Sequence, residues 1–187
     1  MTKTTRMIFA GFGGQGVMLM GQIISFAGML EGKHVTWMPS YGPEMRGGTA
    51  NCTVVISDEE VASPVTNQAE IIVAMNIPSL LKFESYVTKD GFLLLNQSVV
   101  DREPTRTDIN IVKVPCNEIA DELGNLKVAN MVMLGAVLGS TNVVSQESVF
   151  KALEKKLSGG KASLIEINKQ AIMRGFEIGK SGNLINK

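Results

Sequence analysis

The chain has 187 residues, of which 44% are hydrophobic and 19% are charged. This composition suits one globular domain with a buried core. The 18 basic and 18 acidic residues cancel, whereas nucleic-acid binding is typical of a basic excess or stripe. Two cysteines cannot supply the four thiolates of an iron–sulfur cluster, and one histidine leaves little material for a zinc site or a catalytic triad. We therefore expect no metal site and no catalytic group of the chain's own.

The most apolar run, residues 128–139, is 12 residues long and contains Asn130, so it is too short to cross a bilayer. The first residues lead directly into a strand pattern, without the apolar segment of a signal peptide. These features predict a cytoplasmic protein that binds neither membranes nor nucleic acid. Because no repeat or long linker divides the chain, we expect a single domain over 1–187, with an ordered core at about 5–179 and a frayed C-terminal tail.

Strand and helix patterns alternate through the first two thirds of the chain. Short apolar runs predict strands at Arg6–Ala10, His34–Met38, Ala50–Ser57, Ile71–Met75, Phe92–Leu95 and Ile109–Val114. Helical patterns cover Gly14–Glu31, a segment from the Asn76 cap to about Val87, Asn117–Leu123, Val128–Leu138, Gln146–Leu157 and Lys161–Ile178. This order predicts an α/β fold: a three-layer α/β/α domain with a mostly parallel or mixed sheet and a helical last third.

The most informative segment is the glycine-rich turn between the first strand and the first helix. Gly11, Gly13, Gly14, Gln15 and Gly16 form it. A turn of this kind exposes backbone N–H groups at a helix N-terminus, where the helix dipole favours an anion. The spacing of Gly11, Gly13 and Gly16 also matches the dinucleotide-binding pattern, but such a short match occurs by chance and can mark only close helix–sheet packing.

Two nucleotide-binding interpretations are disfavoured. A Rossmann site needs an acidic residue at the end of the second strand to hold the ribose, and that strand instead runs through Met38 into Pro39. A P-loop needs Lys and Ser or Thr after the last glycine, where this chain has Val17 and Met18.

The first helix carries small residues at helical spacing. Gly21, Ser25 and Gly28 share a face with Gly14 and Met18. Interior glycines cost roughly 1 kcal/mol each relative to alanine, so we expect a compensating close approach to another helix or to a partner subunit. The apolar stripe expected to face the sheet consists of Val17, Met20, Ile24 and Ala27.

A second loop follows the second strand and contains two prolines, glycines, an aromatic ring and a charge pair. It leaves from the same sheet edge as the glycine-rich turn, the edge at which open α/β sheets bind ligands, so the two loops could be neighbours. Tyr41 and Arg46 are candidate ligand contacts, because the guanidinium suits a carboxylate or phosphate. The alternative is a solvated loop with a weak surface ion pair between Glu44 and Arg46.

Both loops together resemble the gamma subunit of 2-oxoacid:ferredoxin oxidoreductases, over about Thr5 to Gly179. The segments that carry the resemblance are Gly11–Gly16, Ser40–Gly48, Ala50–Cys52, Ala129–Met131 and Leu134–Gly135. The form of the second loop is more similar to the 2-oxoglutarate or branched-chain type than to the pyruvate type.

The resemblance implies a subunit of a CoA-acylating, oxidatively decarboxylating enzyme. Alpha and beta subunits would carry thiamine diphosphate, Mg and iron–sulfur clusters, a ferredoxin-like delta subunit could join them, and ferredoxin would accept the electrons. Coenzyme A (CoA) would lie at the surface of this chain, which holds no cofactor alone and is expected to be inactive in isolation.

On this hypothesis the cofactor-facing residues are Gly11, Gly13, Gly14, Gln15, Gly16, Tyr41 and Arg46, and the partner interface consists of Pro43, Glu44, Met45, Gly47, Gly48 and Asn51. Two alternatives stay open. One is a purely structural assembly subunit, and the other is a free-standing nucleotide-binding oxidoreductase.

Overall fold

The computed structural model describes residues 3–41, 48–61, 63, 65–158 and 162–185. Six strands form one mixed sheet in the order β2-β3-β1-β4-β5-β6. Their bounds are β1 Thr4–Phe12, β2 His34–Tyr41, β3 Thr49–Ser57, β4 Ala69–Ala74, β5 Val87–Asn96 and β6 Asn110–Val114. β1, β4, β5 and β6 pair in parallel, whereas β3 is antiparallel to both of its neighbours.

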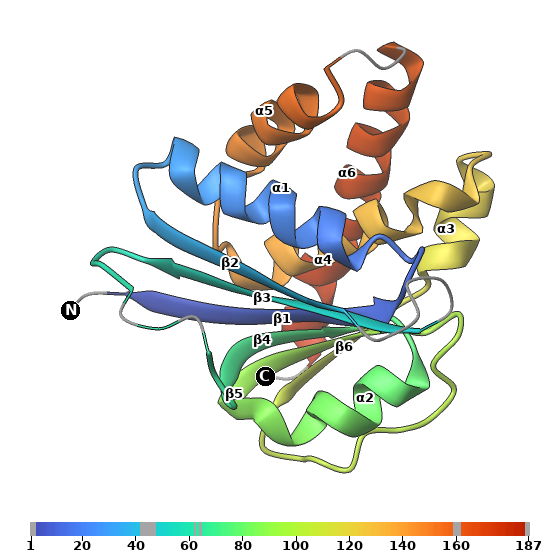
Figure 1. Cartoon of the computed structure of the whole chain (residues 1–187). Coiled ribbons are helices and arrows are strands. Elements are labelled where there is room, and N and C mark those ends of the chain that lie inside the picture. The colour runs from blue at the N-terminus through green and yellow to red at the C-terminus, as the bar shows by residue number, and fades with distance from the viewer. Residues whose placement is uncertain (1–2, 42–47, 62, 64, 159–161, 186–187) are drawn as a thin grey trace.

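The helices are α1 Val17–Leu30, α2 Ile77–Phe83, α3 Cys116–Glu122, α4 Ala129–Thr141, α5 Gln146–Lys156 and α6 Ala162–Ile185, with short 3-10 turns at Glu84–Tyr86 and Leu126–Val128. α1, α4, α5 and α6 lie on one side of the sheet and α2 lies on the other (Figure 1). The predicted three-layer α/β/α fold with a mixed sheet is therefore confirmed.

The central strands are buried on both faces. In β1, Met7 and Phe9 belong to the core under α1 and α4, while Ile8 and Ala10 belong to the smaller core under α2. This division follows from the alternation of side chains along a strand. Because neither face meets water, the central strands read as continuous apolar runs.

The helix pair α4 and α6 packs backbone against backbone. A Cβ added to Gly135 would lie 2.0 Å from the carbonyl oxygen of Ile172, and one added to Gly175 would lie 1.8 Å from that of Val132. Gly139 and Gly179 repeat this pattern one turn further along both helices. The two helices therefore run parallel, at a separation that only glycine permits.

The glycine face of α1 packs against the sheet, so the prediction that it faces another helix or a partner subunit was wrong. A Cβ at Gly21 would lie 2.4 Å from Cys52 Sγ, and one at Gly28 would lie 3.0 Å from side-chain carbons of Val35 and Ile56. Both glycines therefore allow α1 to pack closely against strands β2 and β3.

Most element boundaries shift by a few residues, and three differ most from expectation. β5 begins at Val87, because Asp90 adopts φ 62° and lets the strand continue through the predicted turn. α6 continues past Ile178 to Ile185, into the segment expected to fray. The expected helix after Asn76 ends sooner, at Phe83, and Asn76 caps it as predicted, accepting a hydrogen bond from Ser79 N at 2.8 Å.

Candidate functional site

The glycine-rich turn joins the carboxyl end of β1 to the N-terminus of α1. Gly14 and Gly16 have φ of 101° and 75°, a region that glycine enters without steric cost. Gly16 is the N-cap residue of α1, and no acidic side chain occupies the first turn of that helix. The partial positive charge of the helix end is therefore not neutralised by a carboxylate of its own first turn.

Gln15 braces the turn from inside. Its Oε1 accepts hydrogen bonds from Phe12 N at 2.7 Å and from Asn76 Nδ2 at 3.2 Å, and its Nε2 donates to the Met75 carbonyl at 2.9 Å. The side chain thereby links the β1–α1 turn to the β4–α2 junction. Gln15 thus shapes the turn, with its amide committed to the chain's own atoms.

Asn130 closes the turn from the start of α4. Its side chain is 6% exposed, and its Nδ2 lies 3.4 Å from the Gly16 carbonyl oxygen. A Cβ at Gly16 would lie only 2.2 Å from that Nδ2. Two features therefore require glycine at position 16: its positive φ and the close approach of the Asn130 side chain. The N-termini of α1 and α4 consequently meet at one place.

The glycine-rich turn contacts Gly48, the described residue at the end of the second loop. Gly13 N donates to the Gly48 carbonyl oxygen at 3.0 Å, and Asn51 lies in β3 opposite Ala10 of β1 and Ser40 of β2. β2 ends at Tyr41. The Tyr41 side chain lies outside the described residues, as do the other expected contacts of this loop, Pro43, Glu44, Met45, Arg46 and Gly47.

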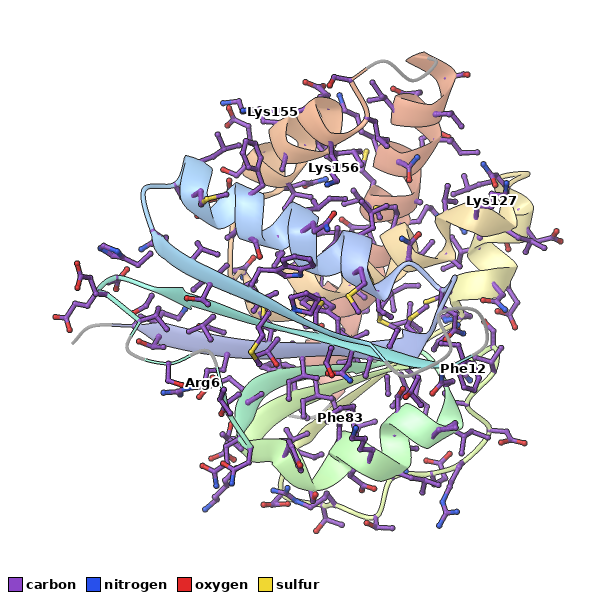
Figure 2. All side chains as sticks on the ribbon, viewed as in Figure 1. Arg6, Phe12, Phe83, Lys127, Lys155 and Lys156 are labelled. Atoms are coloured by element: carbon purple, nitrogen blue, oxygen red, sulfur yellow. The ribbon has the colours of Figure 1, made fainter. Side chains whose placement is uncertain are left out.

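The turn borders a pocket of about 370 Å³. Its walls combine the glycines with side chains of Phe12, Met18, Leu19, Gln22 and Ala50. Phe12 lies at the end of the sheet where α3 also begins (Figure 2). Gly13 N and Gln15 N donate within the chain, to Gly48 O and Phe12 O. The N–H groups of Gly14 and Gly16 have no acceptor among the described residues.

Gly11 has a different role from its neighbours. It is buried in β1, and an added Cβ would lie within 3.0 Å of Gln15 Oε1, Val17 Cγ1 and Met75 Cβ. Gly11 therefore allows the turn, α1 and β4 to approach one another, and its own atoms lie beneath the surface.

Chemically reactive groups are absent from this rim within the described part of the chain. Cys52 and Cys116 are free and buried. Burial raises the pKa of the Cys52 thiol to about 12 and raises the pKa of Cys116 further, so both stay protonated thiols at neutral pH. No group of three or more His, Cys, Asp or Glu residues suited to a metal ion occurs in the described ranges. The same ranges contain no helix with the length and hydropathy of a membrane span. In the part of the rim that the structure describes, backbone N–H groups are present but no accessible nucleophile or general base is.

The comparisons with known proteins define the class. Residues 6–178 match the family model described as pyruvate ferredoxin/flavodoxin oxidoreductase. The chain belongs to this family, which confirms the resemblance carried by its two loops.

Individual relatives show which members of the family the chain resembles. The chain is 37% identical to the 2-oxoglutarate synthase subunit KorC of Methanocaldococcus jannaschii, covering 91% of each chain. It is 38% identical to the ketoisovalerate oxidoreductase subunit VorA of Methanothermobacter marburgensis over 94% of its own length, but it spans only 36% of that relative. Its fold matches the keto/oxoacid ferredoxin oxidoreductase gamma subunit of Geobacter sulfurreducens with a TM-score of 0.84 at 30% identity, covering 96% of this chain and 98% of that one.

Sequence reasoning assigned no site role to Asn130 and predicted only a helix cap for Asn76. Both are buried polar side chains, and buried amides are retained where they have hydrogen-bond partners. The available signal was an asparagine inside the most apolar run of the chain. Its partner, Gly16, is 114 positions away, so the sequence could not identify it.

Proposed function

We propose that this chain is the gamma-type subunit of a multi-subunit 2-oxoacid:ferredoxin oxidoreductase, and that the rim formed by the two loops faces CoA in the assembled enzyme. The carrying observation is the hydrogen bond from Gly13 N to Gly48 O. It joins the glycine turn to Gly48, two positions after Arg46 in the sequence, and so supports a shared edge for the two loops. Backbone donors at a helix N-terminus suit a phosphate group, and CoA carries several phosphates.

The ligand contacts in this proposal divide by type. Gly14 and Gly16 offer backbone N–H groups, while Tyr41 and Arg46 supply side chains from the second loop. Gly11, Gly13 and Gln15 hold the turn in shape. The residues proposed to contact partner subunits are Pro43, Glu44, Met45, Gly47, Gly48 and Asn51.

The chemistry of the reaction belongs to the partners in this proposal. Alpha and beta subunits hold thiamine diphosphate, Mg and iron–sulfur clusters, a ferredoxin-like delta subunit can join them, and ferredoxin accepts the electrons. The absence of an accessible nucleophile or acid–base group at the described rim supports this division. The proposed location is the cytoplasm.

The first test compares the isolated chain with the reconstituted complex. We expect no CoA-dependent oxidation of 2-oxoglutarate, 3-methyl-2-oxobutanoate or pyruvate by the chain alone, and oxidation of one of the first two by the complex. Turnover by the purified chain alone would contradict the proposal.

The second test separates ligand contact from a purely structural role. In the intact complex, Arg46→Ala should raise the KM for CoA roughly tenfold with little change in kcat, because a contact made equally in the ground and transition states affects KM. Arg102→Ala is the matched control, since Arg102 is exposed on the loop after β5. An unchanged KM with weakened assembly would favour the structural subunit. Tight calorimetric binding of NAD or FAD to the free chain would favour the nucleotide-binding oxidoreductase.

A further inference from the structure

A second pocket lies between α1, α5 and β2. It adjoins the pocket at the glycine-rich turn, because Gln22 of α1 lines both. Its volume is about 350 Å³, within the lower range of small-molecule sites. Its walls are largely apolar and are formed by Ile23, Phe26, Met29 and Ala152 together with the ring of Trp37. Ile23, Phe26 and Met29 come from α1, Ala152 from α5 and Trp37 from β2.

Two residues that line this pocket carry buried polar atoms, Ser25 Oγ without a hydrogen-bond partner and Trp37 Nε1 with only a weak one. Ser25 is 6% exposed, and its Oγ finds no donor or acceptor in the described structure. Trp37 Nε1 is equally buried, and its hydrogen-bond partner is the Cys52 thiol, a weak acceptor. A buried polar group without a partner costs about 1–3 kcal/mol, and both Ser25 and Trp37 line the pocket. The unpartnered Ser25 hydroxyl therefore favours an occupant with a hydrogen-bond acceptor.

The charged side chains that line the pocket are all positive. Lys155 and Lys156, in the last turn of α5, line it, and Figure 2 shows both on the α5 side of α1. Lys155 Nζ lies 4.6 Å from the centre of the Phe26 ring. Neither lysine forms an ion pair with any acid that the structure describes, and no carboxylate lines the pocket. An anionic group is thus complementary to this site.

The position of α5 over α1 is held by contacts of the chain itself. Glu31 Oε1, at the end of α1, accepts a hydrogen bond from Ser145 N, at the start of α5, at 2.7 Å. The pocket is therefore formed within this subunit, without a contribution from a partner.

We propose that this pocket binds a small aliphatic carboxylate. The apolar body of the ligand packs against Phe26 and Met29, and its carboxylate lies at Lys155 and Lys156. One oxygen of this carboxylate accepts a hydrogen bond from Ser25 Oγ. The proposal is independent of the CoA-facing rim, because it requires only this chain.

The experiment uses the full chain and 4-methylpentanoate as the probe. Trp37 is the only tryptophan, so its indole ¹H–¹⁵N signal and its fluorescence report on this pocket alone. We expect a saturable shift of the indole signal at millimolar probe. The uncharged isostere 4-methylpentanamide should bind roughly tenfold more weakly, and acetate should give no saturable shift.

Variants test the individual groups. Replacing both lysines, Lys155→Met with Lys156→Met, should weaken binding roughly tenfold, and Ser25→Ala should weaken it roughly fivefold. Lys151→Met is the matched control, because Lys151 lies on the same helix but pairs with Glu147, and it should leave affinity unchanged.

Three results would overturn the proposal, and none depends on a variant that folds poorly. The first is no indole shift at saturating probe, which would mean that only water meets these groups. The second is equal affinity for the acid and the amide. The third is an indole shift that appears only when other subunits are added, which would assign the pocket to a partner side chain.

Discussion

The α4–α6 contact and the β1–α1 turn both depend on glycine, for opposite reasons. In the helix pair, glycines remove side chains so that two backbones meet, with a Cβ at Gly175 placed 1.8 Å from a carbonyl oxygen. In the turn, Gly14 has no atom within 4 Å of such a Cβ but has φ of 101°. In the helix pair, glycine allows close packing of two backbones. In the turn, it allows a backbone conformation with positive φ. Glycine content alone therefore does not separate packing from a binding site.

The largest expected effect tests the packing side of this comparison. Gly175→Ala should lower the free energy of unfolding by about 3 kcal/mol, because α4 and α6 must separate to admit a methyl group against backbone. Urea denaturation measures this loss. Gly182→Ala is the control on the same helix, where the nearest atom is a Val112 methyl at 3.3 Å. It should be neutral or stabilising by up to about 1 kcal/mol. Equal losses at both positions would contradict the close-packing explanation.

The next prediction compares two glycines of the turn, one required by its backbone conformation alone and one also by a close side-chain contact. Gly14→Ala meets only an unfavourable φ and should cost about 1 kcal/mol. Gly16→Ala meets the same strain and also the Asn130 amide at 2.2 Å, and should cost about 2–3 kcal/mol. A double-mutant cycle with Asn130→Ala should show that the losses are not additive, because the second change removes the clash. Additive losses would mean that the two residues do not constrain each other.

A smaller loss is expected from the brace of the turn. Gln15→Ala removes the bonds to Phe12 N, Met75 O and Asn76 Nδ2 and should cost about 2 kcal/mol, since these groups lose their partners. Thermal unfolding measures it, and the exposed Gln97→Ala should change little. If both variants unfold alike, the Gln15 bonds contribute nothing to the turn.

The smallest effect concerns the acid that joins α1 to α5. Burial alone would raise the pKa of Glu31, but hydrogen bonds from the Ser145 backbone and side chain outweigh it and lower the pKa below the ordinary 4.5. A carboxyl with a lowered pKa stabilises the fold above its unfolded pKa, and this contribution is lost as pH falls through the folded value. Glu31→Gln should therefore cost up to about 1 kcal/mol at pH 7.

The pH dependence of unfolding checks the sign. The difference in stability between the wild type and Glu31→Gln should shrink as the pH falls from 7 to 3. A difference that stays constant over this range would show that the charge of Glu31 is not what holds Ser145.

Local pattern predicted most of the elements, because strand alternation, caps and turn residues act over a few positions. The Asn76 cap and the buried run of β4 are examples. Errors arose where distant segments decide the outcome. The backbone conformation of Asp90 is supported by its N–H, which donates to Asp108 O at 2.9 Å, so β5 extends through a segment whose residue types are typical of a turn.

The sequence by itself determined the fold class and the family, because these follow from the order of elements and from motifs of adjacent residues. Only the tertiary structure decided which donors of the turn stay free, since Gly48, Asn76 and Asn130 approach it from distant positions. It also decided that Gly21 and Gly28 face the sheet, and that Ser25, Trp37 and the α5 lysines line one pocket. Hydrogen bonding and close packing depend on distances in space, which no spacing along the chain specifies.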